Sequence, residues 1–90
     1  MSITVEIAGV FRSYFDGEKN VTTEGRTVGE CLKYLSEKYP STRKMFIDDD
    51  GNLRKHFEVL LNGESTYRTG PGTPVRDGGR MELVYIISGG

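Results

Sequence analysis

The chain has 90 residues, 36% of them apolar, with a formal net charge of −1 from 12 basic and 13 acidic residues. This length fits one small domain with a modest core and is too short for two cores. Because charges of both signs are interspersed and no apolar run approaches the roughly 20 residues of a membrane span, we expect neither nucleic acid nor a membrane as partner. Met1 to Glu6 alternate instead of forming a secretory signal, and a single cysteine cannot make an internal disulfide. We therefore expect a cytoplasmic protein.

Two strand signals come before any helix signal. Ile3, Val5 and Ile7 alternate with polar or small neighbours, which predicts a half-buried strand. After a turn region that ends at Lys19, a weaker strand is predicted over Val21–Thr23. The two strands are expected to form a hairpin.

The clearest local signal is the start of a helix. Thr27 and Glu30 stand three apart in the pattern of a capping box, in which each side chain satisfies a free backbone N–H. Apolar residues then recur at helical spacing, namely Val28, Cys31, Leu32, Leu35 and Tyr39. Pro40 ends the element because the residue before a proline disfavours the helical conformation. Since Cys31 lies on the apolar stripe, we interpret it as a core residue rather than a redox thiol.

The second half of the chain predicts further strands separated by turns. The expected elements are a short helical turn and a loop within Ser41–Lys55, a strand from Phe57, a tight turn at Asn62-Gly63, a return strand over Glu64–Arg68, a break at Gly70–Pro74 and a last strand over Met81–Ile87. The apolar run at the end of the last strand predicts a central position in the sheet, beside the first strand, or cover by a partner.

This order predicts an α+β roll, in which a mixed sheet of four to five strands carries one main helix on one face. Such a layout is the β-grasp, or ubiquitin-like, arrangement. We divide the chain into a β-grasp domain over residues 1–84 and a flexible tail over residues 85–90 that ends in Gly-Gly.

Several candidate motifs fail on spacing. Placing Asp48–Gly51 in a calcium loop puts Phe46 and Phe57 at ligand positions, so a solvated turn is the better interpretation. His56 has no carboxylate or second metal-type ligand beside it, which favours a surface position or a strand start. The glycines of residues 70–72 are not followed by the Lys-Ser/Thr of a phosphate loop. We predict no catalytic residue, no metal site and no cofactor bound by this chain.

The sequence finishes with Gly89 and Gly90. At the average glycine usage of about 7%, two glycines fall together at a given pair of positions about 0.5% of the time. Residues without a Cβ are slim and can thread a narrow channel to present a terminal carboxylate to an enzyme. A carboxylate needs activation, which transfer of AMP from ATP provides, before a sulfur nucleophile or an amine can attack. The tail therefore predicts a macromolecular group carrier whose terminus reacts.

The sequence resembles the ubiquitin-like sulfur carriers, a family that includes the small subunit of molybdopterin synthase and the carriers of thiazole and cysteine synthesis. The resembling stretches are Phe11-Arg12, "RTVGECLKYLSEKYP", "GNLRKHFEVLLNGE" and "TPVRDGGRMELVYIISGG". The chain departs from the family at Gly79, where aspartate is common, and at Tyr85-Ile86-Ile87, where proline is favoured. Both departures leave the expected fold unchanged and bear only on the identity of the activating enzyme or acceptor that fits the tail.

The resemblance implies that Gly90 is adenylated by a separate ubiquitin-activating-like adenylyltransferase that uses ATP. The terminus then becomes a thiocarboxylate and donates sulfur to a sulfur-accepting biosynthetic enzyme in cofactor or cysteine synthesis. Gly89 and Ser88 would give access to the channel. The chain would be a carrier or small non-catalytic subunit and not itself an enzyme.

An apolar sheet face next to the tail is the expected docking surface. The candidates are Leu60, Val84 and Ile86, because they alternate away from four predicted core positions, Val59, Leu61, Met81 and Leu83. Ordinary packing is the alternative for the same positions. Two other functions stay open beside the sulfur carrier: a protein modifier joined to lysines, and a non-covalent β-grasp interaction module.

Overall fold

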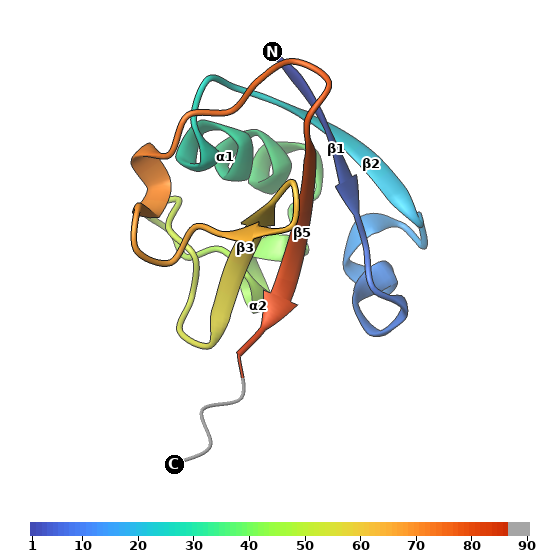
Figure 1. The fold of residues 1–90 in the computed structure, drawn as a ribbon. Coiled ribbons are helices and arrows are strands. Elements are labelled where there is room, and N and C mark those ends of the chain that lie inside the picture. Colours follow the sequence, from blue (N-terminus) through green and yellow to red (C-terminus); the bar gives the residue numbers. More distant parts are fainter. Residues whose placement is uncertain (87–90) are drawn as a thin grey trace.

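A computed structural model describes residues 1–86 (Figure 1). Its elements are, in chain order, β1 (Ser2–Glu6), the 3-10 helix η1 (Gly9–Phe15), β2 (Asn20–Glu24), α1 (Val28–Lys38), α2 (Thr42–Met45), β3 (Phe57–Leu61), β4 (Glu64–Ser65), the 3-10 helix η2 (Gly70–Gly72) and β5 (Arg80–Tyr85). The strands form one sheet in the order β2-β1-β5-β3-β4. Strand β1 pairs parallel with β5, and the other pairs are antiparallel. The predicted mixed sheet with a central last strand is confirmed.

The core lies between the sheet and α1, which packs on one face of it (Figure 1). In β1, Ile3 and Val5 are buried while their neighbours are exposed, as the alternation of the sequence predicts. The helix buries four of the five residues of the predicted stripe, with Cys31 and Leu35 fully inaccessible, while Tyr39, directly after its last residue, is partly buried. The sequence pattern of both elements thus specifies the same core.

Helix α1 starts at the predicted cap. The Thr27 hydroxyl oxygen accepts a hydrogen bond from the Glu30 N–H at 3.2 Å. The Glu30 carboxylate accepts one from the Arg26 N–H at 3.0 Å, which is one residue before the cap residue itself. The capping box is therefore confirmed with its second bond shifted by one residue. At the other end, the Tyr39 N–H makes the last helical bond to Leu35, directly before Pro40.

Three elements differ from the sequence-based expectation. The segment expected to be a turn region forms η1, whose last residue, Phe15, is fully buried. The expected return strand over Glu64–Arg68 is reduced to β4, because the chain turns at Thr66, whose carbonyl accepts from the Gly70 N–H at 2.7 Å. Strand β5 begins one residue earlier than expected and includes Tyr85, so the expected division of the chain at residue 84 falls inside this strand.

Candidate functional site

The central strand β5 carries the chain to the base of the tail, at the end of the sheet opposite the N-terminus (Figure 1). Beyond Tyr85, the Ile86 N–H donates to the carbonyl oxygen of His56 at 2.6 Å. This bond extends the pairing of β5 with β3 by one step. The base of the tail is therefore fixed to the sheet up to Ile86.

Aromatic contacts add to this attachment. Tyr85 is paired with Phe57 across the strands, and their ring centroids lie 5.4 Å apart, edge to face. Phe57 in turn contacts Phe46, a fully buried residue, at 4.9 Å. Edge-to-face pairs of this kind each add about 0.5–1.5 kcal/mol beyond the burial of their area. The last strand is thus connected to the core through a row of rings that the sequence pattern did not indicate.

His56 occupies a turn directly before β3. The Phe57 N–H donates to the Arg54 carbonyl at 3.3 Å, and His56 has a φ of 74°. A non-glycine residue in the left-handed region costs of order 1 kcal/mol, and here that conformation accompanies the bond from the His56 carbonyl to Ile86. The side chain is exposed. The predicted surface position at a strand start is confirmed, and the backbone role of His56 at the tail base is new.

The docking candidates lie on the face of the sheet away from α1. Leu60 is paired with Glu82, and Val84 with Glu58, and all four side chains are partly buried. Leu60 and Val84 are therefore diagonal neighbours with a carboxylate beside each. Ile86 is also partly buried and lies beyond them, at the tail base.

The four predicted core positions divide three to one. Val59, Met81 and Leu83 are buried as expected. Leu61 packs against the same core but is only partly buried, because it lies at the end of β3 beside the turn into β4. The alternation along β3 and β5 separates a core face from an open face as predicted.

Cys31 is fully buried, which confirms the interpretation as a core residue. Burial raises the pKa of its thiol above the usual value, so the reactive thiolate is disfavoured. The Thr23 hydroxyl donates to the Cys31 carbonyl at 2.6 Å and fixes α1 against β2.

The acidic turn after α2 satisfies its own backbone. The Asp48 carboxylate accepts from the N–H groups of Asp50 and Asn52 at 2.9 and 3.0 Å. Within residues 1–86, no group of three or more metal-type side chains comes together. No helix in this part of the chain is long and apolar enough to cross a bilayer.

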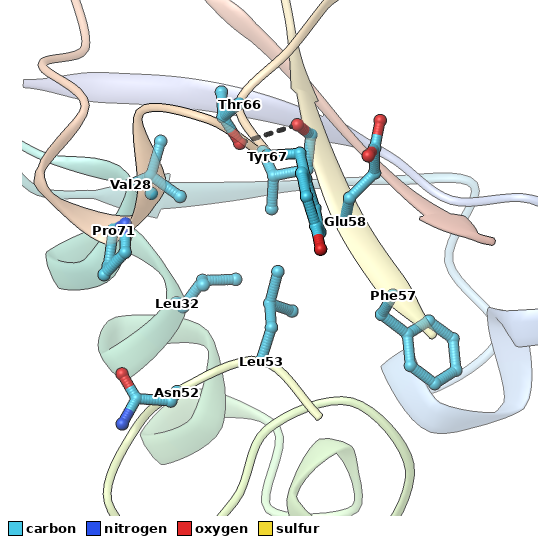
Figure 2. A pocket seen from close by; sticks show the side chains of 11 residues that line it. Val28, Leu32, Asn52, Leu53, Phe57, Glu58, Thr66, Tyr67 and Pro71 are labelled. Carbon is cyan, nitrogen blue, oxygen red and sulfur yellow. Dashed lines mark hydrogen bonds between the residues drawn. The ribbon is translucent and has the colours of Figure 1, made fainter. Parts of the chain in front are cut away.

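An apolar cavity of about 210 Å³ opens between α1 and the segment after β4 (Figure 2). Leu32, Leu53 and Tyr67 face it from three different parts of the chain. The Thr66 hydroxyl at its wall donates to the Val59 carbonyl at 2.8 Å. Glu58 is the one carboxylate in the lining, which includes no histidine, lysine or cysteine. The lining suits an apolar side chain and offers no acid–base pair.

The predicted site residues of the tail, Ser88, Gly89 and Gly90, lie outside the described residues. Their roles in access and sulfur attachment stay predictions. What the structure describes is the platform that precedes them, which consists of Tyr85 and Ile86 together with the residues that hold them, Phe57 and His56.

The fold and this platform define a ubiquitin-like β-grasp protein. The CysO chain in the crystal structure of the Amycolatopsis orientalis BexX/CysO complex superimposes with a TM-score of 0.81 at 25% identity, over 98% of this chain and 99% of that one. SAMP1 from Haloferax volcanii, a small archaeal modifier protein, gives a TM-score of 0.80 at 27% identity, with both chains fully covered. The predicted fold is confirmed.

The chain belongs to the ThiS family, whose family model matches residues 5–90. The sulfur carrier protein CysO of Mycobacterium bovis is 26% identical over 93 aligned positions, which cover all of both chains. The resemblance to the ubiquitin-like sulfur carriers is confirmed, and this similarity supports a sulfur-carrier role.

Proposed function

We propose that this chain is a sulfur carrier protein whose Gly90 carboxylate is adenylated by a partner enzyme and converted to a thiocarboxylate. The observation that carries the proposal is the match to the ThiS family, which runs to residue 90 and therefore includes the Gly-Gly sequence. Full-length similarity to sulfur carrier protein CysO supports it.

The chemistry proceeds in two displacements. A carboxylate oxygen of Gly90 attacks the α-phosphorus of ATP, an acyl adenylate forms, and pyrophosphate leaves. Hydrosulfide, or an equivalent sulfur nucleophile, then attacks the carbonyl carbon, a C–S bond forms, and AMP leaves. The partner enzyme supplies ATP and the sulfur nucleophile, while this chain supplies the carboxylate and the surface by which it is recognised.

The described residues support this division of roles. The tail extends from a base held by the bond between Ile86 and His56 and by the contact of Tyr85 with Phe57. A fixed base limits the positions that Gly90 can take and lowers the entropy lost when the tail enters a channel. The open sheet face with Leu60 and Val84 is the surface on which the adenylating partner docks. After the thiocarboxylate has formed, a biosynthetic enzyme accepts the sulfur.

Intact-mass analysis tests the proposal. The chain is incubated with ATP, its adenylyltransferase and a sulfide donor, and we expect a mass gain equal to exchange of one oxygen for one sulfur. Deletion of Gly90 should abolish the gain. Gly72→Ala is the matched control, because a methyl group there meets no atom within 4 Å, and it should be loaded like the wild type. A wild type that gains no sulfur contradicts the proposal.

A modifier role is the second candidate, because SAMP1 matches the whole chain at 27% identity. In that case a lysine amine of another protein attacks the carbonyl carbon of the same acyl adenylate, an amide bond forms, and AMP leaves. Trypsin cuts after Arg80, the last basic residue, so conjugates would carry residues 81–90 on the modified lysine. Detection of this remnant on cellular proteins favours the modifier, and its absence alongside sulfur loading favours the carrier.

A further inference from the structure

Two surface hollows meet at the base of the tail. One is lined by Glu58, Ser65, Tyr67, Arg68 and Ile86. The other is lined by Leu53, Arg54, Lys55, His56, Phe57, Tyr67 and Ile86. Because both share Tyr67 and Ile86, their basic residues lie around one point. We name the polar and aromatic residues around Ile86 the tail-base collar: Arg54, Lys55, His56, Tyr67, Arg68 and Tyr85.

The collar concentrates positive charge in a chain whose formal net charge is −1. Arg54, Lys55 and Arg68 are exposed, and Glu58 is the one carboxylate that lines either hollow. No ion pair joins these three cations to a carboxylate within residues 1–86. Charge of one sign that is left unpaired at a surface attracts a surface of the opposite sign and speeds association with it.

The collar is also held in place. The Arg54 guanidinium donates through Nε and Nη2 to the Arg43 carbonyl, at 3.1 and 2.6 Å. The turn that contains Lys55 is fixed by the backbone bond between His56 and Ile86. Tyr67 and Tyr85 are 76% and 54% exposed. Large aromatic side chains are enriched at protein interfaces compared with the rest of the surface. One positioned cation, two further exposed cations and two exposed rings together have the composition of a protein contact site.

The length of the tail determines what the collar meets. Residues 87–90 span at most roughly 14 Å when fully extended. In a channel about as long as these four residues, Ile86 lies at the mouth when Gly90 reaches a nucleotide at the far end. The collar then faces the protein around the mouth, while the nucleotide lies at the other end of the tail.

We propose that the tail-base collar docks on an acidic protein surface around the channel mouth of the adenylating partner, with Tyr67 and Tyr85 packing against that rim. The inference rests on the proposed function, because the partner is the enzyme that adenylates Gly90.

The test measures ATP–pyrophosphate exchange by the purified adenylyltransferase from the same organism, at a series of concentrations of this chain. Lys55→Glu combined with Arg68→Glu reverses the collar charge. Arg26→Glu combined with Lys33→Glu makes the same change in net charge at exposed positions before and within α1. We expect the collar variant to raise KM about tenfold with little change in kcat, and the control to stay within about twofold of the wild type. Added salt should raise the KM of the wild type and reduce the difference between the variants.

The outcomes separate the two proposals. A wild type that supports no exchange at any salt concentration overturns the proposed function and the collar with it. Exchange by the wild type with equal KM for both double variants overturns the collar alone. A fall in kcat without a change in KM also overturns it, because a docking surface acts on encounter and not on the chemical step. Melting temperatures of the two variants near that of the wild type show that both are folded.

Discussion

Cys31 shows how a single position on the helix determines the chemistry of a thiol. It is fully buried between α1 and the sheet, and burial raises its pKa. The unfolded chain exposes the thiol at its usual pKa of about 8.5. At a pH between the pKa of the unfolded thiol and the higher pKa of the folded thiol, the unfolded state has released a proton that the folded state keeps. The free energy of unfolding therefore falls as pH rises through this window.

We therefore expect wild type to lose stability relative to Cys31→Ala as pH is raised from 7 to about 10, by up to about 1.4 kcal/mol for each pH unit inside the window. Urea unfolding at a series of pH values measures the difference, and other titrating groups cancel because both proteins carry them. At pH 7 the native thiol should react slowly with a thiol reagent and rapidly after unfolding. Equal reaction rates in the two states would contradict the buried position.

Gly25 has a different constraint, which is the space between β2 and the first turn of α1. A Cβ at this position would lie 2.7 Å from the Glu30 Cβ and 2.8 Å from the Cys31 backbone nitrogen. Backbone atoms cannot move aside without displacing the helix. We expect Gly25→Ala to lower the free energy of unfolding by about 1–3 kcal/mol.

Gly72→Ala is the matched control for this prediction, because its added methyl group meets nothing within 4 Å. Chemical denaturation of both variants measures the difference. Coincident midpoints would show that α1 shifts freely against β2 and that the close approach is unimportant. The sequence alone did not mark Gly25, since the contact depends on how β2 and α1 meet in three dimensions.

At the scale of elements, the β3–β4 hairpin shows a local signal with a long-range consequence. Asn62 and Gly63 have φ values of 51° and 84°, as the predicted tight turn requires. Asn62 also binds β5, because its side-chain oxygen accepts from the Arg80 N–H at 2.9 Å and its own N–H donates to the Arg80 carbonyl at 2.8 Å. One residue therefore sets the turn and holds the start of the central strand.

Two substitutions separate these roles. Asn62→Gly keeps the positive φ but loses the acceptor, and we expect a loss of about 1 kcal/mol in the free energy of unfolding. Asn62→Ala loses the acceptor and also disfavours the positive φ, and we expect a loss of about 2 kcal/mol in the free energy of unfolding. Thermal or urea unfolding measures the order of the three proteins. If Asn62→Gly matched the wild type, the side-chain bond to β5 would contribute nothing.

Elements with a local signal were predicted well from the sequence. The alternation of β1, the cap at Thr27 and the Asn62-Gly63 turn all depend on neighbours within a few residues. Helix η1 was missed because its seven residues have no regular period, and its burial depends on the contact of Phe15 with Phe46, 5.7 Å away and far along the chain. The conformation of such a segment is determined by tertiary packing and not by its local sequence pattern.

The candidate site also combines a local signal with contacts that depend on the fold. The Gly-Gly motif is visible in the amino-acid sequence, but the platform of Tyr85, Ile86, Phe57 and His56 is not. The bond from Ile86 to His56 and the two hollows around Tyr67 join residues from β3, from β4 and from the loops that precede and follow the β3–β4 hairpin with Ile86, the residue after β5. Because Lys55 and Arg68 are brought together by the β3–β4 pairing, the charge of the collar appears only in the folded chain.

At the scale of the whole molecule, one sheet separates stability from recognition. Val59 is fully buried against the α1 side, and the next residue, Leu60, faces the open side and is partly exposed. Val84 lies on the same open side, diagonal to Leu60. Substitutions on the two faces should therefore affect different measurements.

We expect Leu60→Thr combined with Val84→Thr to raise the KM of the chain for its adenylating partner about tenfold or more, while the melting temperature changes by only a few degrees. Val59→Ala should do the opposite, because deleting two buried methyl groups costs about 1–3 kcal/mol of stability and leaves the open face intact. Pyrophosphate exchange measures KM, and thermal unfolding measures stability. Unchanged KM in the double variant would remove Leu60 and Val84 from the docking surface. The tail-base collar would then remain as the proposed contact, because its charge-reversal test uses residues outside this pair.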